Sequence, residues 1–597
     1  MPPMSARLTG ASMTGKTVQD ASNVDQASCA RKANLTGGTH RQVTLTSESG
    51  ETISFEVIEP LAINCTSGNP LVLHGHGFGG QRVQDPASDG LIDRLRKNGY
   101  AVISIDQRGF NDSTGTVRVM DPNFEGKDLL QILDWAEKHL DYLAYEPANG
   151  ALNLVAGATG GSYGGMYQLL IHNIDAKRRL DALTPDITPN DLRYSLNPGR
   201  VIKSGWAQLL VAGGESGANQ PVVGGLDPVV KETLVRGTAT NVIDAGALPF
   251  FFYHSVQYFL DGATVKQDPI TFVSSMGGQL SSGFDYLFKG PPKPVDILFS
   301  QGVRDTLFNL NEAINNFNGY RALGGDVRLL THETGHLLPA PIQAAGGKFA
   351  CGGLNRNDAV VAFLNEKLRP PARESISDVM LASVEQLRGG VINGAEKKSV
   401  CLALADDDVV FVEPSRLRQV DAPITFDGSG MPVPNGAPSA LTTQLAGSLP
   451  IPIPIPTTNP IPPTFIKLLD VPAGGKVLAG VPQLDAVLSS VLPADGCAVG
   501  SAAPPELPVN GCDAIAFVGL GVRTAGGTPR LIDDQVRPLR GLGPHKVDLV
   551  AVAERLRQGE ELGLLVYGFQ QQYHTSFSRD VTIPAFTLSG RIALPMR

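Results

Sequence analysis

The chain has 597 residues, more than one hydrophobic core usually serves, so we expect two or three domains. Hydrophobic residues make up 42% and charged residues 18% of the sequence, as in an ordinary globular protein. No run of about 18 apolar residues could cross a bilayer. The net charge of -9 comes without a cluster of Lys and Arg. We therefore expect neither a membrane span nor a nucleic-acid partner.

The six cysteines are an even number and favour disulfides. Cys29 and Cys65 flank an expected hairpin, and Cys497 and Cys512 bracket a loop rich in Ala, Pro and Gly, where bridges would fasten irregular backbone. We expect at least two bridges and a secreted or periplasmic protein, with a cytoplasmic protein holding reduced thiols as the alternative. Residues 1–30 lack the apolar core of a secretory signal, so export would require a signal already removed.

The first 105 residues contain three kinds of sequence. Residues 1–40 are rich in Ser, Thr, Ala and Gly without periodicity, which predicts a flexible arm. Arg41–Glu59 alternates between apolar and polar residues around a Ser-Glu-Ser-Gly turn, the pattern of an antiparallel hairpin. Pro70–Leu73 and Tyr100–Ile105 are then apolar strands, separated by a helix that ends at Gly99.

Strands and helices continue to alternate further along the chain, which predicts a parallel sheet with helices on its faces. This α/β catalytic domain covers residues 41–175 and 291–372. Its further expected elements are a helix over Leu129–Leu140, strands over Leu152–Ala156, Val295–Phe299 and Val327–Leu330, and helices around Asn311–Phe317 and Asp358–Leu368.

Two regions depart from this alternation. Residues 176–290 contain helical segments at Pro228–Gly237 and Phe250–Leu260, which predicts a helical cap inserted over the sheet. The aromatic run Phe250–Tyr253 suits either the core of the cap or a wall of the substrate site. Residues 375–597 have short alternating runs, such as Ser399–Leu404 and Val409–Val412, with frequent Pro and Gly, which predicts an all-β sandwich.

A G-x-S-x-G pentapeptide at residues 160–164 marks a candidate nucleophile, Ser162. The expected strand Leu152–Ala156 precedes it, and a helix begins around Met166. A serine between them would lie on a tight strand-to-helix turn whose strained backbone requires small neighbours. A glycine-rich loop without chemistry is the alternative in a chain with 67 glycines.

A serine nucleophile needs a base and an acid that orients the base, and in this kind of sheet they follow in the order serine, acid, histidine. Asp305 comes directly after the expected strand Val295–Phe299, at the edge where catalytic groups of open α/β sheets collect. Its alternative role is an N-cap before the next helix. His336 follows the strand after that and is our candidate base; His332 is the less favoured choice.

An oxyanion hole needs two backbone N-H groups directed at the developing charge. Tyr163, the residue after the nucleophile, would supply one. The second would come from the glycine-rich loop at residues 74–80, with Phe78 as our candidate and His76 as the alternative. His74 and His76 lack a third ligand at a fitting spacing, so we expect no metal site, and the reaction needs no cofactor.

These residues resemble the cocaine esterase and X-prolyl dipeptidyl aminopeptidase group of α/β-hydrolases. The resemblance rests on the nucleophile turn Gly161–Gly165, on the segment Asp106-Gln-Arg108-Gly109 with Ser113 and Gly115, and on the order of domains. It implies an α/β-hydrolase fold with an inserted helical cap and a C-terminal all-β jelly-roll domain. Asp106 and Arg108 would form an ion pair that holds their loop.

The sequence departs from both branches of that group. The peptidase members carry a lysine before the nucleophile, where this chain has Gly161, and we identify no clamp for a free amine. The esterase branch uses a tyrosine hydroxyl near the first oxyanion loop, where this chain offers backbone donors. We therefore expect a serine hydrolase that cleaves a small-molecule or polymeric carboxylic ester, with an X-prolyl dipeptidyl peptidase or another amide hydrolase as the alternative. A non-catalytic binding protein is less favoured, because no triad candidate is missing. The sequence does not predict the oligomeric state.

Overall fold

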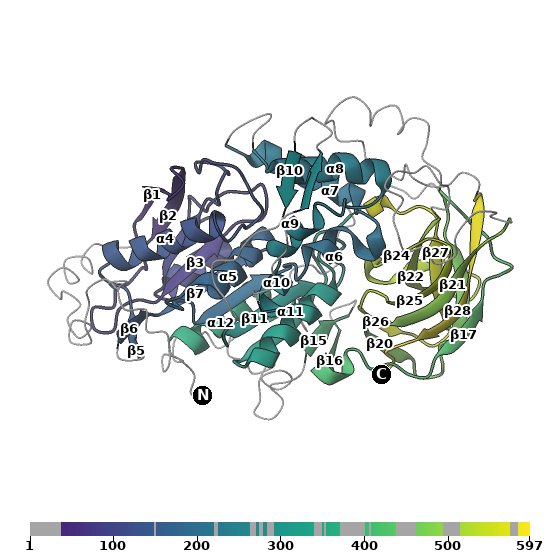
Figure 1. Ribbon diagram of the computed structural model, residues 1–597. Coiled ribbons are helices and arrows are strands. Elements are labelled where there is room, and N and C mark those ends of the chain that lie inside the picture. Colours follow the sequence, from purple (N-terminus) through teal and green to yellow (C-terminus); the bar gives the residue numbers. More distant parts are fainter. Residues whose placement is uncertain are drawn as a thin grey trace, which may run out of the picture.

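The structure is a computed structural model. It describes residues 38–148, 151–219, 225–262, 270–273, 279–282, 292–338, 349–350, 354–369, 400–404, 408–436, 461–492, 514–573 and 583–597. The predicted flexible arm therefore lies almost wholly outside the described residues. Figure 1 shows a central sheet with helices on its faces, a group of helices above it, and a separate all-strand part at the C-terminal end of the chain.

The central sheet is built from buried apolar strands. Its described strands run in the order β1-β2-β4-β3-β7-β8-β11-β12, and short strands extend it beyond β12. The pairs from β4 to β12 are parallel, whereas β1 and β2 form the predicted antiparallel hairpin. The bounds are β1 His40–Thr46, β2 Thr52–Ile58, β3 Leu71–Gly75, β4 Ala101–Ile105, β7 Ala156–Gly161, β8 Ala182–Asp186, β11 Asp296–Gly302, β12 Val327–His332, β13 Phe349–Ala350 and β14 Leu354–Asn355.

Amphipathic helices cover this sheet, as the alternation of elements predicted. In the first of them Leu91, Ile92 and Leu95 are buried, and the Asp89 side chain caps its N-terminus. The α/β-hydrolase architecture expected from the sequence is confirmed. The helices are α3 Gly90–Lys97, α4 Glu125–His139, α5 Tyr163–Ile174, α11 Leu310–Leu323 and α12 Arg356–Leu368.

The strand that leads to Ser162 differs from the prediction. Residues Ala151–Leu154 form β6, which pairs with β5, Tyr145–Ala148, in a separate hairpin. The strand before the serine is β7, Ala156–Gly161, and α5 begins directly at Tyr163 instead of around Met166. The prediction failed because β7 contains only Ala, Gly and Thr. Its neighbours leave little room: a Cβ on Gly157 would lie 2.9 Å from the carbonyl oxygen of Ala182.

The cap insertion begins later in the chain than predicted. Residues Ala182–Asp186 form β8, which lies between β7 and β11 in the central sheet and is buried along its length. The prediction missed this strand because its five residues, Ala-Leu-Thr-Pro-Asp, show neither alternation nor a long apolar run. Its fourth residue is a proline, which cannot donate to the hydrogen-bond ladder and argues against a central strand.

Most elements between β8 and β11 lie above the sheet in Figure 1, whereas the short helix α10 lies beside α11 and α5. They are mostly helical, as predicted, but include a hairpin of β9 and β10. The run Phe250–Tyr253 is buried, and Phe250 and Phe251 pack edge to face with each other. The bounds are α6 Leu192–Leu196, α7 Ser204–Gly217, α8 Pro228–Thr240, α9 Leu248–Tyr253, α10 Val256–Leu260, β9 Ile270–Val273 and β10 Gln279–Ser282.

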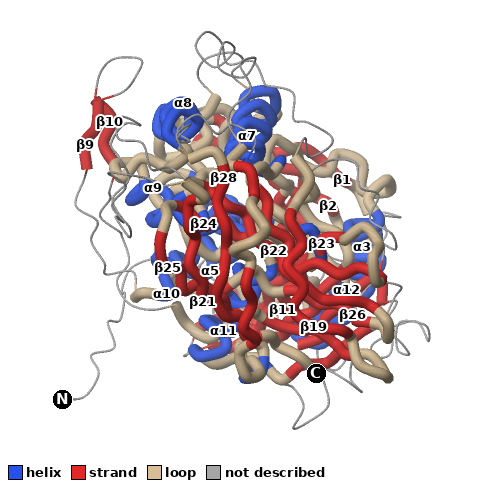
Figure 2. The backbone as a smooth tube through the Cα atoms, turned by 90° about the vertical axis from the view of Figure 1, so that its right-hand side faces the viewer, coloured by secondary structure: helices blue, strands red, loops and turns tan. Residues whose placement is uncertain are grey.

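The C-terminal part contains two sheets that share one apolar core, as predicted for a β sandwich, and Figure 2 shows the strands of this part facing the viewer. Strand β21 alternates strictly between exposed and buried residues, because one face meets the second sheet and the other meets solvent. A shared apolar core joins the sheets. One sheet contains β17 Ile424–Asp427, β18 Val433–Pro434, β28 Ala585–Ala593, β21 Gln483–Ser490 and β25 Gly543–Asp548; the other contains β19 Thr464–Asp470, β27 Glu560–Tyr567, β22 Ile515–Thr524, β23 Arg530–Leu531 and β24 Arg537–Arg540; β20 Lys476–Gly480 pairs with β26 Val552–Leu556.

Two runs assigned to the sandwich belong to the central sheet instead. Strand β15, Val400–Ala403, pairs with β12 in parallel, and β16, Val409–Val412, pairs with β15. All four residues of β15 are buried, so the edge of the central sheet supplies the apolar surface that this run needs. A short alternating run cannot indicate by itself which of two sheets it joins.

The remaining predictions concern cysteines and membranes. Cys65 and Cys401 are the cysteines among the described residues, and neither is a free thiol. The predicted pairs Cys29–Cys65 and Cys497–Cys512 each include a residue outside the described part, so both stay predictions. Across the described residues, every helix is too short or too polar to span a bilayer.

Candidate active site

The turn between β7 and α5 holds Ser162 in an unusual conformation. Its φ of 59° and ψ of -119° are rarely adopted by a residue other than glycine. The Ser162 N-H donates to the carbonyl oxygen of Asp186 at 2.8 Å. A Cβ on Gly164 would lie 2.1 Å from the carbonyl oxygen of Gly75, and one on Gly160 would lie 2.4 Å from the same oxygen. The glycines of the pentapeptide are therefore required by the close approach of β3.

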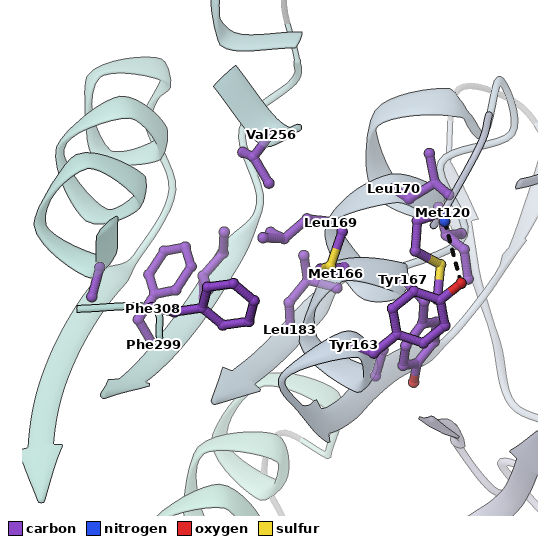
Figure 3. Packing of buried hydrophobic residues seen from close by; sticks show 14 of the residues in the cluster. Met120, Tyr163, Met166, Tyr167, Leu169, Leu170, Leu183, Val256, Phe299 and Phe308 are labelled. Atoms are coloured by element: carbon purple, nitrogen blue, oxygen red, sulfur yellow. Dashed lines mark hydrogen bonds between the residues drawn. The ribbon is translucent and has the colours of Figure 1, made fainter. Parts of the chain in front are cut away.

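Helix α5 anchors this turn in the core. Figure 3 shows Tyr163, Met166, Leu169 and Leu170 packed among buried residues of neighbouring elements. The Tyr163 hydroxyl accepts a hydrogen bond of 3.3 Å from the backbone N-H of Met120. The buried residues of α5 lie on all sides of the helix, which fits a helix enclosed between the sheet and the cap.

The structure brings Ser162, Asp305 and His336 together. His336 Nε2 lies 2.9 Å from Ser162 Oγ, and His336 Nδ1 lies 2.6 Å from Asp305 Oδ2. The ionised carboxylate accepts the Nδ1 proton, so Nε2 is left as the acceptor for the serine hydroxyl. Asp305 also accepts backbone N-H groups: Oδ1 binds those of Leu307 and Phe308, at 2.9 and 2.7 Å. This arrangement can withdraw a proton from Ser162 Oγ.

His332 makes different contacts. Its Nε2 donates to Asp186 Oδ1 at 2.9 Å, and its Nδ1 accepts from the Thr334 hydroxyl at 2.6 Å. Asp186 also binds the Ser300 hydroxyl at 2.5 Å and contacts Arg356. Burial raises the pKa of the Asp186 carboxyl, but Arg356, His332 and the hydrogen bonds outweigh burial and lower it well below its ordinary value. His332 thus belongs to a charged network behind the nucleophile turn.

The glycine-rich loop after β3 lies beside the nucleophile turn. A Cβ on Gly77 would lie 4.0 Å from the carbonyl oxygen of Gly161. The rings of Phe78 and Tyr163 meet edge to face with centroids 5.2 Å apart. The loop of Phe78 therefore packs against the residue that follows Ser162, and the roles of the Phe78 and Tyr163 N-H groups stay predictions.

The histidines of this loop are used within the fold. His76 Nε2 accepts the backbone N-H of Gln107 at 3.0 Å, and its Nδ1 donates to the carbonyl oxygen of Gly77 at 2.7 Å. His74 Nδ1 lies 2.9 Å from the Ser104 hydroxyl. Burial lowers the pKa of His76, and lowers that of His74 to about 4. In the part of the chain that the structure describes, no group of three or more His, Cys, Asp or Glu side chains could hold a metal ion.

Asp106 and Arg108 do not pair with each other, which corrects the expected ion pair. Asp106 contacts the Arg82 guanidinium and accepts the Arg82 N-H at 2.7 Å. Arg108 forms a bidentate pair with Asp128, with both distances 2.7 Å. The chain turns directly after Asp106, where the Phe110 N-H donates to the carbonyl oxygen of Gln107 at 3.0 Å, and each side chain reaches a different partner. Both still fasten the loop after β4.

Sequence reasoning missed three side chains that hold the loops of Asp305 and His336. Lys203 and Trp206, at the start of α7, and Gln535, in the β sandwich, all donate to residues 303–307. Lys203 is 2% exposed although it carries a charge. The signal in the sequence was this single lysine within the apolar stretch Val201–Trp206, but its partners lie about a hundred residues away in the sequence.

The family comparison supports the resemblance drawn from the sequence. Residues 33–221 match the model described as X-Pro dipeptidyl-peptidase, S15 family. The predicted family resemblance is confirmed. The match includes Ser162 and the loop of Phe78, and it indicates a hydrolase of the α/β type. Asp305 and His336 lie beyond the matched residues. A comparison with curated proteins gives no match.

Solved structures share the fold over nearly the whole chain. A CocE/NonD family hydrolase from Staphylococcus aureus is similar with a TM-score of 0.54 and 12% identity, over 94% of this chain and 97% of that one. An aminopeptidase from a Thaumarchaeota archaeon of marine sediment gives 0.55 and 12%, over 94% and 97%. An alpha-amino acid ester hydrolase gives 0.56 and 12%, over 100% of both chains. At this identity the likeness shows the fold alone.

Proposed function

We propose that this protein is a serine hydrolase that cleaves carboxylic esters through an acyl-enzyme. The observation that carries the proposal is the continuous chain of hydrogen bonds from Ser162 Oγ through His336 to Asp305 Oδ2, with lengths of 2.9 and 2.6 Å. The strained backbone of Ser162 supports it as well, because such strain is typical of a nucleophile elbow.

In the proposed reaction, His336 Nε2 takes the proton of Ser162 as Oγ attacks the acyl carbon. Asp305 holds the imidazole orientation and stabilises the imidazolium that forms. The N-H groups of Tyr163 and Phe78 would bind the oxyanion of the tetrahedral intermediate. His336 then gives its proton to the departing alcohol, and water releases the acid by the reverse sequence of proton transfers.

The preference for esters over peptides rests on what surrounds the triad. The residue before the nucleophile is Gly161, which carries no cation. The rings that meet His336 are those of Trp206 and Phe308, with centroids at 6.0 and 5.2 Å, and both are uncharged. Asp186, which lies opposite Gly161 in the pairing of β7 with β8, is already engaged by His332 and Arg356. A small or polymeric ester without a free amine suits this environment.

The second candidate is an X-prolyl dipeptidyl peptidase or another amide hydrolase. The S15 family match over residues 33–221 favours it. Turnover of a short-chain nitrophenyl ester and of an Ala-Pro anilide, compared in wild type and Ser162→Ala, tests both candidates. Ester turnover that the variant loses, with the anilide uncleaved, supports the esterase; anilide turnover that the variant loses supports the peptidase.

We also propose that the protein acts outside the cytoplasm with its cysteines bridged. The support is that neither Cys65 nor Cys401 is a free thiol, and disulfides persist in oxidising compartments. Mass spectrometry of unreduced proteolytic peptides tests this: Cys65 should appear linked to Cys29. Detection of all six cysteines as free thiols in protein from its native cell would contradict the proposal.

A further inference from the structure

The side chain of Lys203, a buried lysine of the cap, is hydrogen-bonded to the loop that carries Asp305. Lys203 Nζ donates to the carbonyl oxygens of Thr306 and Leu307, both at 2.8 Å. The side chain is 2% exposed, and the charged groups that face it at longer range are Asp305, Glu312 and Arg537. Because burying an ammonium group is costly unless it is well paired, packing alone does not explain a lysine here.

Thr306 connects this loop to the backbone of His336. The Thr306 backbone N-H and its hydroxyl both donate to the carbonyl oxygen of His336, each at 2.9 Å. Trp206 Nε1, one turn along α7 from Lys203, donates to Thr306 Oγ1 at 3.2 Å. Lys203, the N-cap residue of α7, and Trp206 in its first turn therefore hold Thr306 at two atoms, and Thr306 holds the loop of His336.

The β sandwich contacts the same Asp305 loop at the preceding residues. Gln535 Nε2, between β23 and β24 in sequence, donates to the carbonyl oxygens of Val303 and Asp305, at 3.0 and 2.9 Å. Arg304 in the same loop pairs with Asp534 at 2.6 Å. Close packing joins these parts, since a Cβ on Gly199 would lie 2.5 Å from the carbonyl oxygen of Pro538.

We infer that Lys203 is a positioning residue for Asp305, holding the acid loop from the cap while Gln535 holds it from the β sandwich. The inference rests on the proposed serine-hydrolase function. Without the ammonium group, two buried carbonyl oxygens would lose their donor and the loop would shift to satisfy them. A shift of about 1 Å in a catalytic group can cost about a hundredfold in rate. The loss would fall on kcat, because Lys203 touches the loop and not the substrate.

The test compares Lys203→Met, Lys203→Arg and Gln535→Leu with wild type. The control is Lys127→Met on α4, whose side chain is 39% exposed and pairs with Glu48. We expect Lys203→Met to lower kcat for a nitrophenyl ester about 10- to 100-fold, with KM changed less than about twofold. Lys203→Arg keeps a cationic donor and should recover part of the loss. Gln535→Leu should also lower kcat. If circular dichroism shows that Lys203→Met does not fold, Gln535→Leu tests whether the contacts that hold the Asp305 loop support kcat.

A second readout needs no substrate. The short hydrogen bond from His336 Nδ1 to Asp305 should give a low-field proton resonance in wild type that His336→Asn lacks. We expect Lys203→Met to shift or broaden this resonance, and Lys127→Met to leave it unchanged. A folded Lys203→Met with wild-type kcat and an unshifted resonance would overturn the inference. A wild type without Ser162-dependent turnover would contradict the proposed function instead, and the resonance would then decide the inference alone.

Discussion

The backbone N-H of Ser162 donates to the carbonyl oxygen of Asp186 at 2.8 Å, and this bond links the nucleophile turn to the end of strand β8. The Asp186 side chain is held by Ser300, His332 and Arg356. The candidate site thus has two histidines with separate tasks. His336 contacts the serine hydroxyl, and His332 supports the strand that holds the serine backbone.

Exchanging each histidine for asparagine should separate these tasks. We expect His336→Asn to lower kcat at least about a thousandfold while the folded state keeps most of its stability. His332→Asn leaves the buried Asp186 with one donor fewer, so it should cost about 1–3 kcal/mol of unfolding free energy and leave kcat within about tenfold of wild type. Kinetics and denaturant unfolding measure both effects. The reverse pattern would show that the base has been misassigned.

Replacing the acid should lower the rate without unfolding the protein. Asp305→Asn keeps the size of the side chain but favours the wrong imidazole tautomer, so we expect kcat to fall by about 10⁴-fold. The matched control is Asp134→Asn on helix α4, whose side chain is 54% exposed. It should keep full activity. Steady-state turnover of a nitrophenyl ester measures both variants, and equal rates in the two would argue against Asp305 as the acid.

The glycine at the end of the pentapeptide should tolerate no side chain. Gly164→Ala would place its methyl group 2.1 Å from the Gly75 carbonyl oxygen, so we expect a loss of about 3 kcal/mol or more in unfolding free energy. Gly213→Ala in helix α7 is the control, because a Cβ there meets nothing within 4 Å. It should be neutral or stabilise by up to about 1 kcal/mol. Denaturant midpoints compare them, and equal midpoints would contradict the close packing described above.

Stability should depend on pH through Glu125. Burial first, and then the neighbouring Asp121, raise the pKa of this carboxyl to about 8. An unfolded glutamate loses its proton near pH 4.3, so between these values the folded state binds more protons and the free energy of unfolding falls as pH rises.

Glu125→Gln removes this titration. The unfolding free energy of the variant relative to wild type should therefore rise from pH 5 to pH 8, by as much as several kcal/mol. Urea unfolding at four pH values in this range measures the difference. A difference that stays constant with pH would mean that Glu125 is ionised in the folded protein.

The sequence predicted what short-range patterns encode. The order of strands and helices placed Asp305 and His336 after successive strands, and the structure brings both to Ser162. Strand β7 was not predicted, because its Ala and Gly residues are required by the close packing of β3 and β8. No local sequence pattern indicates such packing. Strand β15 was assigned to the wrong sheet for a similar reason: its partner β12 lies about seventy residues earlier in the chain.

Contacts between side chains that are distant in sequence could not be predicted either. Lys203 and Gln535 contact one loop from opposite sides, at separations of about one hundred and two hundred and thirty residues. The expected Asp106–Arg108 pair failed because neighbours in sequence were taken as neighbours in space. Arg82 and Asp128 are the actual partners, and only the folded chain brings them there.

The most direct test of the account is the hydrolysis of a short-chain nitrophenyl ester by wild type and by Ser162→Ala, with thermal unfolding to show that both are folded. The account predicts turnover by wild type and a loss of more than about 10⁴-fold in the variant, because no other group can form the acyl-enzyme. Turnover by a folded Ser162→Ala at the wild-type rate would contradict the assignment of Ser162 as the nucleophile.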